Sequence, residues 1–208
     1  MITGALLVKI LKNIAIKIHE NKQLLTELDA AIGDGDHGIN MNKGFTAVSK
    51  KLDEIKSHDC GEILKTTAMT LISTVGGASG PLYGTAFLKA SIVAKGKNEL
   101  DKGTIIKMFD EAIKGIVMRG KAQIGEKTML DALIPAYEAL KESLEQGEEL
   151  STAFHKATDA AYEGVQKTKD IIATKGRASY LGERSIGHED PGATSSYLMT
   201  KTIADTLI

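Results

Sequence analysis

The 208-residue chain contains no tryptophan, three prolines and a single cysteine, Cys60. One cysteine cannot form a disulfide within the chain, and this usage is typical of a reducing compartment, so we expect a cytoplasmic protein. Proline interrupts helices, and its scarcity beside abundant alanine, leucine and lysine therefore favours long helices.

The sequence also lacks an excess of either charge, with 26 basic and 27 acidic residues. This balance gives no indication of binding to nucleic acid or to an anionic membrane. No uncharged apolar run approaches the ~18 residues that span a bilayer. Lysines at positions 9, 12 and 17 interrupt the apolar N-terminal segment, which does not read as a signal peptide. We expect one domain over residues 1–208.

Apolar residues recur at helical spacing along most of the chain, beginning with Leu6, Leu7, Ile10, Leu11, Ile14 and Ile18. The pattern predicts further helices over 24–31, 39–55, 63–75, 82–95, 103–118, 128–145, 151–173 and 191–207. Residues 70–75 are rich in β-branched side chains, as in a strand, but the preceding residues keep helical spacing and no partner strand is evident. The predicted fold is all-α, a barrel or bundle of about eight antiparallel amphipathic helices.

Four glycine-bearing segments separate the predicted helices: 33–38, 76–80, 120–125 and 176–192. Joints that follow every second antiparallel helix lie at the same end of a bundle. Glycine-rich backbone that opens onto a helix N-terminus offers N–H groups to an anion. We therefore expect a nucleotide site at one end, although each segment alone could be a tight connection or a surface loop.

Three aspartates, Asp29, Asp34 and Asp36, fall within eight positions and are interleaved with glycines. Carboxylates this close repel one another unless a cation lies between them, and hard oxygen ligands suit Mg²⁺ or Ca²⁺. A calcium EF-hand is excluded because its twelfth position would be Phe45 instead of a bidentate glutamate. A solvated turn with an aspartate cap is the simpler alternative. We predict two Mg²⁺ ions shared with a polyphosphate.

His37 lies inside this aspartate cluster and is expected to contact the ligand, with a phosphoryl-accepting role as the alternative. Residues 120–128 nearly match a P-loop, but Glu126 is inserted before Lys127 and the preceding residues read as a helix. We therefore interpret this segment as a joint that wraps a base or ribose. In the last joint, Arg177 or Arg184 could offset phosphate charge.

Four motifs together carry a resemblance to a known family: Gly-Asp-Gly-Asp-His-Gly at 33–38, Gly-Gly-Ala-Ser-Gly-Pro at 76–81, Gly-Glu-Lys-Thr-Met-Leu-Asp at 125–131 and Gly-Arg-Ala-Ser-Tyr-Leu-Gly-Glu-Arg at 176–184. Over nearly its whole length the chain resembles the nucleotide-binding L subunits of bacterial dihydroxyacetone kinases that depend on the phosphotransferase system. The resemblance implies a barrel of eight amphipathic helices with ADP and two Mg²⁺ at one end.

The resemblance also implies residue roles. The metal ligands of the family fall on Asp29, Asp34 and Asp36. Its nucleotide contacts fall on His37, Gly38, Ile39, Asn40, Ala78, Ser79, Gly120, Met129, Arg177, Asp190, Pro191 and Gly192. No residue of the chain is implied to catalyse the reaction beyond positioning the metal and the nucleotide.

In such a kinase, tightly bound ADP is phosphorylated to ATP by a phosphohistidine of a multidomain phosphotransferase subunit. The γ-phosphoryl group then passes to dihydroxyacetone on a histidine of a separate K subunit, and dihydroxyacetone phosphate is formed. The oligomeric state stays open, a homodimer included.

Three alternatives remain. An ATP-exchanging kinase has an equivalent domain fused behind a K-type domain; a start at Met1 favours a free subunit. The other two are a non-catalytic regulatory nucleotide-binding module and a metal-dependent phosphohydrolase.

Overall fold

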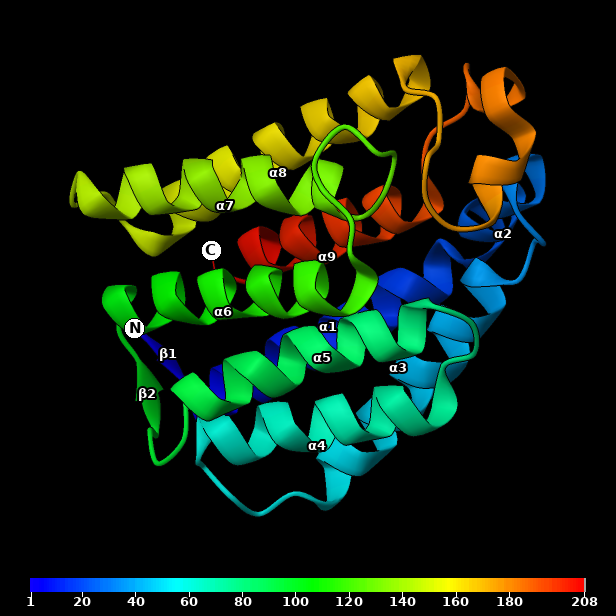
Figure 1. Ribbon diagram of the computed structural model, residues 1–208. Coiled ribbons are helices and arrows are strands. Elements are labelled where there is room, and N and C mark those ends of the chain that lie inside the picture. Colours follow the sequence, from blue (N-terminus) through cyan, green and yellow to red (C-terminus); the bar gives the residue numbers. More distant parts are fainter. Residues whose placement is uncertain (208) are drawn as a thin grey trace.

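The computed structural model describes residues 1–207 and is almost entirely helical (Figure 1). Its α-helices are α1 (Gly4–Glu20), α2 (Lys22–Ile32), α3 (His37–Glu54), α4 (Cys60–Thr74), α5 (Ser79–Val93), α6 (Lys102–Gly120), α7 (Leu130–Glu145), α8 (Leu150–Lys167) and α9 (Pro191–Thr206). Two 3₁₀ helices, η1 (Thr168–Asp170) and η2 (Arg177–Ser185), lie between α8 and α9. The predicted all-α class is confirmed.

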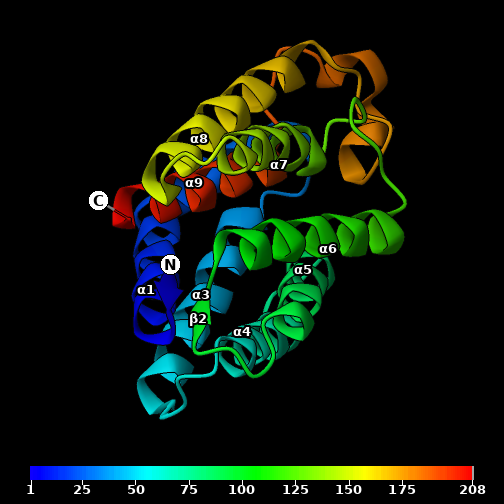
Figure 2. The same cartoon turned by 90° about the vertical axis from the view of Figure 1, so that its left-hand side faces the viewer.

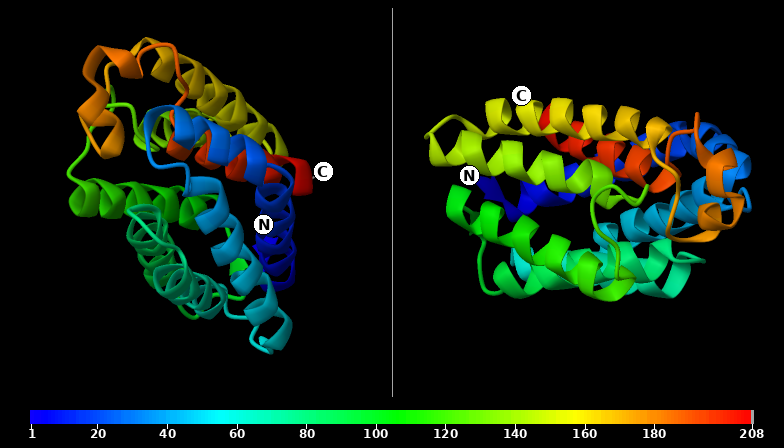
Figure 3. Two further views of the ribbon diagram at one scale, coloured as in Figure 1. Left: turned by 90° about the vertical axis from the view of Figure 1, so that its right-hand side faces the viewer. Right: turned by 45° about the horizontal axis from the view of Figure 1, so that its top comes forward.

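Eight of these helices form a closed ring. Helix α1 packs on α3, each helix from α3 to α9 packs on the next, and α9 returns to α1. The end-on views in Figure 2 and in the left panel of Figure 3 show this barrel-like wall. Helix α2 lies outside the ring, across one end, against α3 and α9. The predicted count of about eight therefore holds for the wall, and α2, which contains the helix predicted over 24–31, covers one end.

The interior of the ring is apolar. Fully buried side chains from opposite parts of the wall, among them Ile18, Phe45, Leu71 and Phe154, belong to one continuous hydrophobic cluster. The packing leaves a cavity of about 150 Å³ between α1, α5, α6, α7, α8 and α9. Within residues 1–207, no helix has both the length and the apolar content needed to cross a bilayer.

Residues 70–75 are ambiguous in the sequence, and the structure places residues 70–74 at the end of α4, with Val75 directly after the helix. The helix begins after Asp59, whose carboxylate accepts the N–H groups of Gly61 and Glu62. The Thr70 and Thr74 hydroxyls donate to carbonyls four residues earlier, so the polar β-branched side chains are satisfied within the helix. The predicted helix is confirmed.

The predicted helix over 151–173 is too long at its C-terminal end, because α8 stops at Lys167. The next residue, Thr168, is completely buried, and its hydroxyl accepts the N–H of Asp190. This long-range contact turns the chain, and the local periodicity does not reveal it. The structure also contains a short antiparallel pair, β1 (Ile2–Thr3) with β2 (Glu99–Leu100), which is too short to leave an alternating pattern.

Candidate functional site

All four glycine-bearing segments meet at one end of the ring. Together with the adjoining helix ends, they line a single cavity of about 440 Å³. Figure 1 shows these joints gathered away from the ends of the chain marked N and C. The prediction that the joints after every second helix share one end is confirmed.

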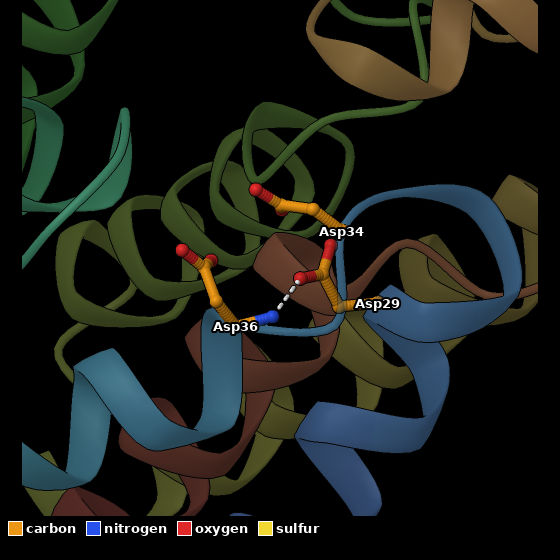
Figure 4. A group of neighbouring side chains, drawn as sticks. All are labelled: Asp29, Asp34 and Asp36. Carbon is orange, nitrogen blue, oxygen red and sulfur yellow. Dashed lines mark hydrogen bonds between the residues drawn. The ribbon is translucent and has the colours of Figure 1, made fainter.

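The aspartate cluster lies in the wall of this cavity. Asp29 is in the last turn of α2, and Asp34 and Asp36 lie in the joint that leads to α3. Each side chain offers one carboxylate oxygen, and the three oxygens lie within 4.8 Å of one another. Figure 4 shows the three side chains close together where the end of α2 and the joint to α3 meet. This all-oxygen set matches the preference of Mg²⁺ for hard ligands, and a cation would relieve the mutual repulsion.

Of the three aspartates, Asp29 has the clearest structural role, because it accepts two backbone hydrogen bonds. Its Oδ2 accepts the backbone N–H groups of Asp36, at 2.8 Å, and of His37, at 3.0 Å. The Asp36 side chain makes no such capping bond, although Asp36 is the residue that precedes α3. Asp29 therefore caps α3 from a neighbouring helix and leaves the Asp36 carboxylate directed to the cavity. The Arg177 guanidinium, from η2, lies 3.0 Å from Asp34 Oδ2.

Both ring nitrogens of His37 are engaged inside the protein. Nδ1 lies 3.0 Å from the Ser79 hydroxyl and Nε2 lies 2.9 Å from the Ser195 hydroxyl. Burial lowers the pKa of His37 to about 4, although the charge of Asp29 acts in the opposite direction. The imidazole is therefore neutral and ties α3 to α5 and α9. This geometry does not favour a phosphoryl-accepting role, because no ring nitrogen is free to attack.

Most of the predicted nucleotide contacts lie around the cavity: His37, Asn40, Ala78, Ser79, Gly120, Met129, Arg177, Asp190, Pro191 and Gly192. Two do not line it. Gly38 is buried against α2, where an added Cβ would lie 2.1 Å from the Lys22 carbonyl oxygen. The Ile39 side chain is 52% exposed on α3. For these two positions, a nucleotide contact stays a prediction from the resemblance.

Four of the α-helices listed above begin at the cavity. These are α3 at His37, α5 at Ser79, α7 at Leu130 and α9 at Pro191. No side chain caps the N-terminus of α5, and Gly77 in front of it adopts a left-handed conformation (φ 65°). Because N–H groups in the first turn of a helix have no partner within the helix, this end of α5 can donate to a phosphate. The predicted anion cradle at 76–80 therefore has suitable geometry.

Two buried charged residues of the site are not predicted by the sequence patterns. Lys127 is 1% exposed and lines the cavity, and Asp131 is 3% exposed beneath it. The Asp131 carboxylate accepts the N–H groups of Gly125 and Thr128 and shapes the loop between α6 and α7. Both residues belong to the Gly-Glu-Lys-Thr-Met-Leu-Asp motif at 125–131, but an incomplete match to a P-loop does not indicate that the lysine is buried.

The burial of Asp190 should make the protein less stable as the pH rises. Burial raises the pKa of its carboxyl group from 3.8 to about 7, although the carboxylate accepts the Ala193 N–H at the start of α9. Between these values the folded protein keeps a proton that the unfolded chain has lost, so raising the pH favours unfolding. The loss is up to about 1.4 kcal/mol per pH unit. Asp190→Asn should remove this component.

The measurement is urea unfolding of the unaltered protein and of Asp190→Asn at pH values from 4 to 8. The difference in unfolding free energy between the two proteins is expected to shift steadily in favour of the variant as the pH rises. Parallel pH profiles would mean that Asp190 is ionised throughout this range in the folded protein.

Comparison with known proteins gives a consistent family assignment. The family model for the DAK2 domain matches residues 31–205. The chain is 48% identical, over 88% of its length and 87% of the relative's, to the Escherichia coli K12 protein named PEP-dependent dihydroxyacetone kinase, ADP-binding subunit DhaL. It is 46% identical, over 92% and 91% of the two lengths, to the Lactococcus lactis protein named PTS-dependent dihydroxyacetone kinase, ADP-binding subunit DhaL.

The fold has a counterpart among solved structures. The dihydroxyacetone kinase from C. freundii, in complex with AMP-PNP and Mg²⁺, superimposes with a TM-score of 0.73 over 97% of this chain, at 23% identity. The present chain spans about one third (34%) of that kinase chain. The family model and the two relatives lead to the same conclusion: the chain belongs to the DAK2 domain family.

Proposed function

We propose that the chain is the ADP-binding subunit of a phosphoenolpyruvate-dependent dihydroxyacetone kinase. One observation carries this proposal. In a chain that is 48% identical to an ADP-binding subunit over most of both lengths, the aspartate cluster and all four glycine-bearing segments line the same cavity.

In this proposal the carboxylates of Asp29, Asp34 and Asp36 hold two Mg²⁺ ions. When bound, these ions neutralise the charge of the nucleotide phosphates during phosphoryl transfer. The N–H groups at the start of α5 donate to the phosphates, and Arg177 adds a positive charge from the segment between α8 and α9. The remaining cavity residues enclose the base and ribose. The chain therefore positions and neutralises, and it contributes no nucleophile.

Bound ADP then acts as a coenzyme. It accepts a phosphoryl group from a phosphohistidine of the phosphotransferase subunit, and the resulting ATP passes its γ-phosphoryl group to dihydroxyacetone on the K subunit. The product is dihydroxyacetone phosphate, in a cytoplasmic branch of glycerol metabolism. The relatives that the chain matches over nearly their full length carry subunit names, which favours this function over an ATP-exchanging kinase.

A reconstitution tests the proposed function. The purified protein is mixed with phosphoenolpyruvate, the general phosphotransferase proteins, the phosphohistidine-carrying subunit, the K subunit and dihydroxyacetone, and no ATP is added. Dihydroxyacetone phosphate should accumulate well beyond the amount of bound nucleotide. Nucleotide released by denaturing the protein should be ADP.

Two control reactions separate the alternatives. Turnover with added ATP in place of the phosphotransferase components would indicate an ATP-exchanging kinase. Release of inorganic phosphate from ATP without any partner would indicate a phosphohydrolase. Nucleotide binding without turnover in the complete mixture would instead favour a regulatory module.

A further inference from the structure

The segment between α8 and α9 forms a lid whose two ends are held together. We define the lid as residues 170–186 and its neck as residues 168–169 with 187–190. In the neck, the Gly187 N–H donates to the Lys169 carbonyl at 2.7 Å, and the Asp190 N–H donates to the Thr168 hydroxyl at 3.0 Å. We expect the lid to swing away from the cavity only when these two hydrogen bonds across the neck break.

The lid lies over the aspartate cluster. It carries Arg177, whose guanidinium is 3.0 Å from Asp34 Oδ2, and both Arg177 and Ala178 line the cavity. Its base also touches the α6–α7 loop, because the Thr174 hydroxyl donates to Glu126 Oε1 at 3.2 Å. The lid therefore forms part of the cavity wall on this side.

Lys127 joins the two sides of the neck. Its ammonium group donates to the Thr168 carbonyl on one side and to the His188 carbonyl on the other. The side chain is 1% exposed, so this charge is placed inside the protein. The residue also holds a left-handed backbone conformation (φ 61°), which non-glycine residues rarely adopt. A buried charge on a strained backbone is costly to maintain, which points to a specific role.

The surroundings of Lys127 support a role inside the protein. Burial lowers the pKa of its ammonium group, while Asp190 and Asp131, on the neck and on α7, raise it. The two carbonyls replace water around the charge. The Lys127 ammonium group is therefore oriented toward the neck. The positive groups that face a ligand in the cavity are the Arg177 guanidinium and the N-termini of the helices.

We propose that Lys127 is a positioning residue that keeps the neck of the lid closed and thereby sets the rate at which nucleotide leaves the site. The identity of the ligand rests on the proposed function. The closure of the neck does not, because it follows from contacts within the chain.

Lys127→Met tests this assignment, since methionine keeps an unbranched side chain and removes the ammonium group. Lys121→Met is the matched control: Lys121 lies in the same loop, has the same left-handed backbone (φ 50°) and is exposed to solvent. Lys127→Arg retains donors for both carbonyls and should restore part of the function. Circular dichroism confirms that each variant is folded.

Two rates are measured. The first is trypsin cleavage within the lid, after Lys175, Arg177 and Arg184, in nucleotide-free protein. The second is release of a fluorescent ADP analogue with Mg²⁺ after addition of excess unlabelled ADP. Both rates should rise about tenfold or more in Lys127→Met, as expected for loss of a buried charged hydrogen bond. Both should stay within about twofold of the parent in Lys121→Met.

Unchanged release and unchanged lid cleavage in folded Lys127→Met would overturn the proposal. So would slower phosphoryl transfer with both rates unchanged, because that result assigns Lys127 to direct contact with the nucleotide. If Lys127→Met does not fold, Lys127→Gln, which keeps a shorter N–H donor, provides the same comparison. If the parent protein does not bind the analogue, the proposed function fails, and lid cleavage still decides the role of Lys127.

Discussion

Asp36→Asn should strongly weaken Mg²⁺-dependent ADP binding and leave the fold intact. Asp36 contributes a carboxylate oxygen to the cluster, yet its side chain does not cap α3, so its charge can be removed without loss of that cap. Replacing a charged ligand by a neutral amide weakens a Mg²⁺ site. We expect affinity to fall about 100-fold or more, equivalent to ~2.7 kcal/mol. Calorimetric titration with ADP, with and without Mg²⁺, gives the measurement.

Asp205→Asn is the control for this change. Asp205 is a carboxylate on α9 that pairs with Lys201 at 3.0 Å on the surface, away from the cavity. Its replacement should leave both ADP binding and stability unchanged, since exposed ion pairs contribute little. Asp29→Asn, by contrast, should lower stability as well as affinity, because Asp29 also caps α3. Unaltered Mg²⁺-dependent binding by Asp36→Asn would refute the metal assignment.

Gly164→Ala should destabilise the whole protein more than most single substitutions. Helices α7 and α8 approach so closely that an added Cβ would lie 2.0 Å from the Asp131 carbonyl oxygen. Backbone cannot move aside as a flexible side chain can, so the helices must separate. We expect a loss of about 2–3 kcal/mol, even after the better helix propensity of alanine is included. Urea unfolding followed by circular dichroism measures it.

Gly103→Ala is the matched comparison, because it places the same methyl group in the first turn of α6. There the added Cβ would meet only the Asp101 carboxylate, at 3.5 Å, which is an ordinary contact. Alanine should therefore be neutral or stabilising, by up to about 1 kcal/mol. Equal stability of the Gly164 and Gly103 variants would show that the α7–α8 interface accommodates the added methyl group without loss of unfolding free energy.

The sequence predicts the elements of this fold better than their ends. Helical spacing locates the wall helices because most of them have one apolar face, and the spacing extends to the β-branched end of α4 at Thr70–Thr74. The end of α8 is different. It is set by Thr168, whose partner Asp190 lies 22 residues further along the chain. Local periodicity contains no information about such a contact.

The sequence also predicts only part of the candidate site. Asp29, Asp34 and Asp36 are close in the sequence, so their proximity in space could be predicted, and glycine marks the joints that complete the cavity. The capping role of Asp29, the paired contacts of His37 and the burial of Lys127 depend on residues up to 158 positions apart. These contacts exist only once the ring has closed.

That closure has a consequence for the order of folding. Helix α9 completes the wall by packing on α1, and its N-terminus lies at the cavity with Pro191, Gly192 and the capping residue Asp190. During synthesis from the N-terminus, the earlier helices therefore leave the ribosome with an open seam and an exposed apolar interior. Nucleotide can be enclosed only after α9 has emerged and sealed that seam. Ligand capture is thus a late event in the life of each new chain, and it reports that the barrel is complete.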